Sequence, residues 1–202
     1  MDAPKSVTAN FIYILPWAKS YGGASNDYAN SIQQTSDGGY IMAGSTESFG
    51  AGNSDFWVLK LNSAGAVAWQ KSYGGTDDDY ASALVQTTDG GYALAGYTSS
   101  FGAFGYDFWL VKTDASGTVQ WNKTYHGTIY DLAFALVQTV DGGYALAGLT
   151  GDLSTDQGDF WLVKTDAEGT VQWNKTYGGT NHDYAYSLVQ TVDGGYALAG
   201  WT

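Results

Sequence analysis

Four short loops carry the residues whose chemistry best suits ligand binding. Each loop ends in an aspartate, and the residue before that aspartate is different in every loop. Carboxylate, amide, phenol and imidazole groups in variable loops suit a glycan, a protein partner or a divalent cation. The candidate binding residues are Asn26 and Asp27, Asp78 and Asp79, Tyr130 and Asp131, and His182 and Asp183.

Three other aspartates are candidates for holding Ca²⁺. Asp77 begins an acidic run, while Asp152 and Asp156 share one acidic loop. Carboxylate oxygens are the hard ligands that Ca²⁺ prefers, although neither segment matches the calcium loop of an EF-hand. We therefore expect no cofactor and no transition-metal site, with Ca²⁺ as the one ion that these residues would suit.

Catalytic chemistry is not expected. His126 and His182 occupy different positions in the loops, and neither has the neighbours of a zinc or nucleophile motif, so both are interpreted as loop residues. Cysteine is absent, which excludes thiolate nucleophiles and disulfides. The glycines at residues 50–52 lack the helix of a dinucleotide-binding fingerprint. A glycan-active enzyme that uses paired carboxylates remains a distant alternative.

The charge balance excludes one large class of partner. The net charge is -12, and the eight basic residues are all lysines. A nucleic-acid surface needs clustered lysine and arginine to neutralise phosphates, so no nucleic acid is expected as a partner. The longest apolar run near the N-terminus, residues 11–15, is too short for membrane insertion or for a signal-peptide core.

The candidate loops belong to a tandem repeat. Tryptophan, tyrosine and Asp-Gly-Gly-Tyr motifs recur every 52 residues, which gives four copies in one register. The tryptophans are Trp17, Trp69, Trp121 and Trp173. In the second copy, two Asp/Gly turns and one longer loop separate four strands, which we expect at residues 81–87, 92–98, 107–113 and 118–125. Each copy is therefore a four-stranded meander.

Both faces of these strands carry apolar side chains, so neighbouring copies must stack face to face. Phe108 and Leu110 lie on one side of their strand, and Trp109 and Val111 on the other. Four-stranded sheets packed radially define a propeller. We therefore predict an all-β fold, a β-propeller of four four-stranded blades in a single domain over residues 1–202.

The segment at residues 113–121, Thr-Asp-Ala-Ser-Gly-Thr-Val-Gln-Trp, resembles the turn and tryptophan of quinoprotein-type (PQQ-like) propeller blades, and more loosely the Asp-box of sialidase-like propellers. The whole unit resembles repeats common in prokaryotic secreted and cell-surface β-propellers. This resemblance implies that the first strand of each blade is innermost. It also implies an extracellular or cell-surface location, with the cytoplasm as the alternative. The resemblance does not imply that the chain binds the quinone cofactor, because the chain has neither arginine nor cysteine for the usual contacts.

The repeat register predicts how the blades divide the chain. Blades are expected at residues 21–73, 74–125 and 126–177, and a fourth blade would combine strands in 1–20 with strands in 178–202. Such a split blade closes the ring and removes free sheet edges. In its N-terminal part, residues 3–7 lack the Phe-Trp pair of the other copies. The alternative is half of an eight-bladed ring, with the split blade formed by two chains, so the protein is expected as a monomer or homodimer.

Two functions follow from these patterns. The Asp/Gly turns are nearly invariant and lie on one face of the predicted propeller, whereas the loops that carry the candidate residues diverge and lie on the other. We therefore expect a non-catalytic binding or scaffold protein that recognises a glycan or protein partner through the variable face. The alternative is a structural unit that assembles itself into an oligomeric ring.

Overall fold

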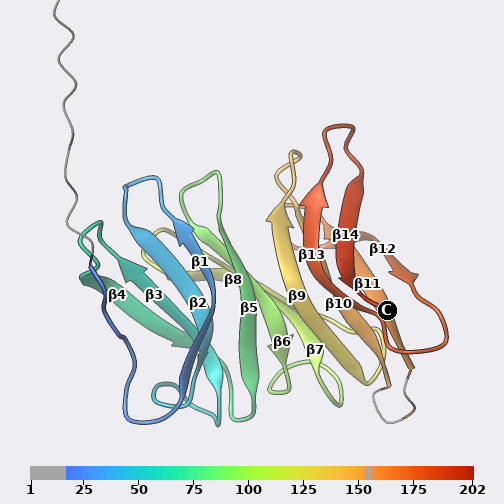
Figure 1. Cartoon of the computed structure of the whole chain (residues 1–202), viewed down its shortest axis with the longest axis horizontal. Coiled ribbons are helices and arrows are strands. Elements are labelled where there is room, and N and C mark those ends of the chain that lie inside the picture. The colour runs from blue at the N-terminus through green and yellow to red at the C-terminus, as the bar shows by residue number, and fades with distance from the viewer. Residues whose placement is uncertain (1–16, 153–154, 156) are drawn as a thin grey trace, which may run out of the picture.

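A computed structural model describes residues 17–152, 155 and 157–202, which form fourteen strands (Figure 1). The first blade contains β1 (Asp27–Gln34), β2 (Tyr40–Thr46), β3 (Asp55–Leu61) and β4 (Val67–Tyr73). The second contains β5 (Asp79–Gln86), β6 (Tyr92–Thr98), β7 (Asp107–Thr113) and β8 (Val119–Tyr125). The third contains β9 (Tyr130–Gln138), β10 (Tyr144–Asp152), β11 (Gln157–Thr165) and β12 (Val171–Tyr177). A two-stranded sheet of β13 (Tyr184–Gln190) and β14 (Tyr196–Trp201) follows.

The observed strands begin and end close to the predicted turns. The second and third strands of the second copy have the predicted bounds, while β5 begins two residues earlier than expected and β8 one residue later. Each four-stranded sheet is an antiparallel meander in chain order. The all-β architecture of repeated blades is therefore confirmed.

A buried lysine fastens the first turn of each complete blade to its third strand. In the third blade, Lys164 is 4% exposed, and its Nζ lies 2.9 Å from Oδ2 of the turn residue Asp141. Hydrogen bonds from the Thr139 hydroxyl and from Lys164 lower the pKa of Asp141 to about 2. The pairs Lys60–Asp37 and Lys112–Asp89 repeat this arrangement. The repeated lysines and turn aspartates thus have a structural role.

The hydrophobic cores lie between the blades. Phe56 of the first blade packs on Trp109 of the second with 4.5 Å between ring centroids, and Phe108 packs on Trp161 of the third at 4.6 Å. Buried aliphatic side chains from both sheets surround each aromatic pair. A further core joins the third blade to the sheet of β13 and β14. Both faces of the central sheets are covered, as the two-sided apolar pattern predicted.

Residues 17–21 continue the same packing at the other end of the array. Trp17 meets Tyr40 edge-on at 5.9 Å, and the Tyr21 hydroxyl donates to the Gly65 carbonyl at 2.7 Å. The outer strands β4 and β8 make equivalent contacts with the blades that follow them. Residues 17–21 therefore occupy the place of an outer strand that precedes the first blade.

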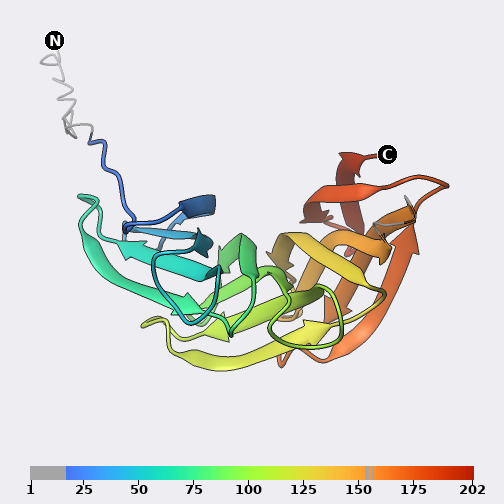
Figure 2. The ribbon, with the colours of Figure 1, turned by 90° about the horizontal axis from the view of Figure 1, so that it is seen from below.

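The described residues form an open arc (Figure 2). The sheet of β13 and β14 lies at one end, and residues 17–21 lie at the other beside the first blade. The predicted inner part of the N-terminal half-blade falls on residues 1–16, which lie outside the described residues. Closure of the ring is therefore not seen in the described part of the chain and stays a prediction.

Candidate functional site

The repeated aspartates of the candidate loops accept hydrogen bonds that connect neighbouring segments of the same blade. The Asp79 carboxylate accepts hydrogen bonds from the Gly75 amide at 2.9 Å and from the Ser100 hydroxyl at 2.8 Å, which joins the loop before β5 to the loop after β6. Asp131 accepts from the Gly127 amide at 2.7 Å and also from the Thr150 hydroxyl. Asp27 and Asp183 accept from the equivalent glycine amides. Four of the eight predicted binding residues thus have carboxylates that already hold loops together.

The other four predicted binding residues belong to four successive copies, each just before or at the start of the first strand, rather than to one cluster. Asn26 is exposed, and its amide donates to Glu47 at 3.0 Å. The backbone N–H of Asp78 donates to Ser99, and Tyr130 lies beside another tyrosine ring. His182 is half-buried, with its ring centroid 5.8 Å from that of Tyr184.

Two of the three calcium candidates, Asp77 and Asp152, are described, and they belong to different blades. Asp77 is exposed, and its backbone N–H donates to the Ser100 hydroxyl at 3.0 Å. Asp152 ends β10 and lines a cavity on the variable face. Asp156 lies outside the described residues.

This cavity has a volume of about 880 Å³ and opens between the β6–β7 loop and the loops of the third blade. Its apolar part includes Phe104, which is 87% exposed, and Ile129. Hydroxyl, carboxylate, amide and imidazole groups form the rest of the wall, from His126, Thr128, Thr150, Asp152, Gln157, Asp159, Thr176 and Thr180. The cavity therefore combines a protruding aromatic ring with convergent polar groups.

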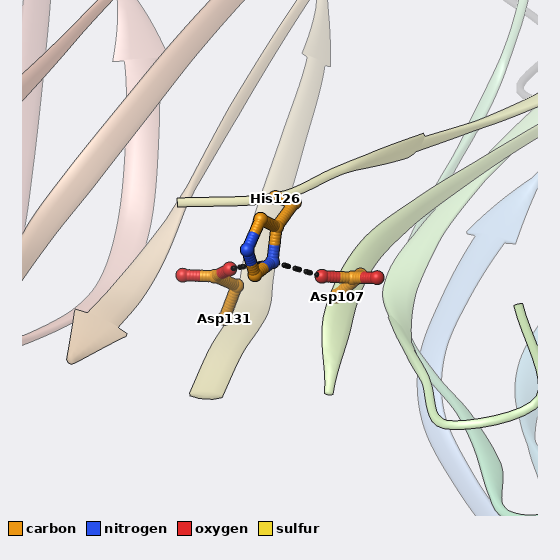
Figure 3. Close-up of side chains that lie close together, drawn as sticks. All are labelled: Asp107, His126 and Asp131. Carbon is orange, nitrogen blue, oxygen red and sulfur yellow. Dashed lines mark hydrogen bonds and ion pairs between the residues drawn. The ribbon is translucent and has the colours of Figure 1, made fainter. Parts of the chain in front are cut away.

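His126, which lines this cavity, forms a cluster with two buried aspartates behind the cavity wall (Figure 3). His126 Nδ1 lies 2.8 Å from Asp107 Oδ1 and 3.6 Å from Asp131 Oδ2. Asp107 begins β7, His126 follows β8, and Asp131 is the second residue of β9. Both carboxylates are buried, whereas 49% of the His126 side chain is exposed. Figure 3 shows the imidazole between the two carboxylates, with an interaction drawn to each of them.

The role of His126 was missed in the sequence, yet the repeat contains a signal for it. The equivalent residue in the other copies is glycine. A Cβ atom added to Gly74 would lie 2.0 Å from Asp55 Oδ1 and 2.6 Å from Asp79 Oδ2, and Gly178 has the same surroundings. Each of these blade junctions therefore holds a narrow crevice between two carboxylates. At the junction between the second and third blades, the imidazole of His126 enters this crevice, and an imidazole can bind a proton or a metal.

The crevice is an unfavourable place for negative charge. Burial raises the pKa of Asp131 even though hydrogen bonds from Gly127, Thr150 and Thr128 act in the opposite direction. Burial likewise raises the pKa of Asp79, and the nearby charge of Asp55 adds to the effect. A proton or a cation between such carboxylates relieves this cost.

A strip of aromatic rings runs across β6, β9, β13 and β14. Phe134 lies 6.4 Å from Tyr97 and 5.1 Å from Tyr186, and Tyr186 stacks on Tyr184 at 5.9 Å. Tyr184 in turn contacts Trp201 at 5.5 Å. Small polar residues occupy the position of Phe134 in the first two copies, so the strip is not a requirement of the blade. It adds exposed aromatic surface to the later blades.

No family model matches the chain. The chain is 27% identical to the regulatory protein FlaEY of Caulobacter vibrioides, over 74% of this chain and 18% of that protein. It therefore spans less than a fifth of the length of this relative. In the described part of the chain, no helix is long and apolar enough to cross a membrane.

Proposed function

We propose that the chain is a non-catalytic binding module that recognises a neutral glycan in the cavity of the variable face. One observation carries this proposal: the cavity is built from loops that differ between copies, whereas the turns of the opposite face are nearly invariant. Side chains that stabilise the blade itself recur in every copy. Side chains that serve one cavity are expected to differ between copies, as those of the cavity loops do.

The chemistry of the cavity suits a sugar. A volume of about 880 Å³ lies in the range of small-molecule sites, which combine apolar walls with a few placed polar groups. The protruding ring of Phe104 offers a flat apolar face for a sugar ring, and Thr128, Asp152 and Gln157 offer partners for hydroxyl groups. The net charge of -12 opposes an anionic sugar. The name of the relative, a regulatory protein, also agrees better with binding than with catalysis.

Replacement of Phe104 by alanine is expected to weaken glycan binding about fivefold, because an aromatic contact contributes roughly 1 kcal/mol. A glycan array would identify the neutral sugar, and calorimetry would then compare the affinities of the variants. Val192→Ala is the matched control, since Val192 is fully exposed in a turn of the opposite face. The proposal is contradicted if no neutral glycan binds, or if Phe104→Ala and Val192→Ala bind equally well.

Assembly is a second candidate function, and the free edge of β14 favours it. In the described part of the chain β14 pairs with β13 alone. Beside it lies a groove of about 530 Å³ lined by Phe160, Leu162, Trp173, Tyr196 and Leu198. In the complete blades a third strand covers the equivalent place. We propose that the N-terminal segment of a second copy pairs with this edge.

Light scattering on the purified chain tests the assembly proposal. Because paired copies share each split blade, the expected mass is at least twice the chain mass of 21.5 kDa. The substitution Leu198→Pro in β14 removes a backbone N–H from the strand and is expected to shift the mass to that of one chain. A single-chain mass for the unaltered protein at all concentrations would exclude assembly.

A further inference from the structure

We infer that Asp107, His126 and Asp131 form a binding site for one divalent transition-metal ion of the zinc type. The sequence alone predicted no such site, and glycan binding does not require it. The inference depends on the geometry of the junction between the second and third blades, and it stands or falls separately from the proposed function.

The donor set fits a transition metal better than Ca²⁺. The site offers one imidazole nitrogen and two carboxylate oxygens, all within 4.8 Å of one another. Zinc binds such atoms at about 2.0–2.2 Å, so two ligands of one ion lie roughly 3–4 Å apart. The separations of 2.8 Å and 3.6 Å from His126 Nδ1 to the two oxygens are near this range. An imidazole ligand favours zinc, cobalt or nickel, because Ca²⁺ prefers oxygen alone.

The charge of the junction favours a cation. Asp107 is 1% exposed and Asp131 is fully buried, and the two carboxylates face one imidazole. The lysine ion pairs of the described residues all lie at the Asp-Gly-Gly turns, on the opposite face. A divalent ion would neutralise both carboxylates and would replace the contact between His126 and Asp107.

Both carboxylates are held in place by neighbouring groups. The Ala103 amide donates to Asp107 Oδ2 at 2.6 Å, which leaves Oδ1 directed at His126. The Gly127 amide and the Thr150 hydroxyl hold the carboxylate of Asp131. Such hydrogen bonds orient metal ligands and lower the entropy cost of binding. The ligands therefore need only small movements to meet one ion.

The repeat provides an internal comparison. The junction of Asp55 with Asp79 and the junction of Asp159 with Asp183 have the same carboxylates, with glycine in place of the imidazole. Blades therefore fold and pack with glycine at this position, and the histidine is an addition to a working junction. This comparison predicts one metal site in the chain rather than one at each junction.

The cavity gives an ion access to the site. His126 lines the cavity, and the exposed part of its side chain faces the opening. A site with three protein ligands leaves at least one coordination position for water or for an oxygen of a bound molecule. A bound ion would therefore stand in the wall of the cavity, at a position where a ligand could reach it.

Metal binding is tested on the full chain after treatment with a chelator. Calorimetry with Zn²⁺, and visible spectroscopy with Co²⁺, are expected to show one ion per chain with an affinity in the micromolar range or tighter. His126→Gly is expected to reduce this affinity at least about 100-fold, since even groups that only orient a ligand contribute 10–100-fold. Asp107→Asn is expected to reduce it similarly.

Two control variants distinguish a metal site at His126 from metal binding elsewhere on the chain. His126→Gly places at this junction the residue that the other junctions carry, so the variant is expected to fold, with an unchanged circular dichroism spectrum. His182→Ala removes the other histidine and is expected to leave metal binding unchanged.

The inference is overturned if the protein binds neither ion below millimolar concentration, because His126 is then a structural ion-pair partner only. It is also overturned if His126→Gly still binds, or if His182→Ala abolishes binding. Glycan binding measured with chelator present reports on the proposed function alone.

Discussion

Replacement of Phe108 by alanine is expected to lower the free energy of unfolding by about 4 kcal/mol. Phe108 is fully buried, and its ring packs on Trp161 with 4.6 Å between centroids. The substitution removes a large apolar side chain and leaves a cavity between two β-sheets, whose hydrogen-bonded strands cannot move together to fill it. Urea denaturation followed by tryptophan fluorescence measures the change.

Phe160 is the matched control, because it occupies the position of Phe108 in the next copy. It is only partly buried and packs into the core beside β13 and β14. Phe160→Ala is therefore expected to cost about 2 kcal/mol, roughly half as much. Equal costs would contradict this difference in packing. They would indicate that a further strand covers Phe160 in solution, as ring closure or assembly through β14 requires.

The fold was largely predictable because its signals are local and are repeated. Each copy places Asp-Gly-Gly between its first two strands, and the second and third copies place an Asp-Ala-x-Gly turn between their last two. Apolar side chains on both faces of the central strands required a covering layer on each side. These constraints are set within a few residues of chain, and four copies confirm one another. Ring closure is different, because it depends on small rotations between blades that accumulate along the array.

The candidate site was less predictable because its contacts join distant segments. Asp107 and Asp131 belong to different blades, and His126 reaches both only because consecutive blades stack. A motif search considers neighbours in sequence and therefore passed over His126. For the repeated aspartates, residue type alone did not indicate a structural contact: the side chains of Asp79 and Asp131 are buried and hold loops, and ligand binding by them stays a prediction. Comparing copies at each position shows departures such as His126, whereas the direction of a side chain requires the structure.

Replacement of Gly148 by alanine is expected to cost about 3 kcal/mol, because the backbone of a neighbouring strand occupies the space for a Cβ atom. A Cβ atom at Gly148 would lie 1.9 Å from the Leu132 carbonyl oxygen. The cause is a β-bulge in β9, where the pairing with β10 shifts at Gly148 and leaves Phe134 as the extra residue. The equivalent glycines of the other copies have the same close contact with backbone, and the pairing of the first strand shifts in each copy.

Gly142 supplies the control that separates steric exclusion from backbone strain. It lies in a turn with φ of +84°, and no atom lies within 4 Å of the place of its Cβ. Gly142→Ala therefore carries only the cost of a left-handed conformation, roughly 1–2 kcal/mol. Thermal unfolding of the two variants compares the costs directly. If Gly148→Ala were no more destabilising than Gly142→Ala, the bulge would not be holding the two strands at this distance. The aromatic strip that the bulge residue Phe134 joins would then have no fixed position.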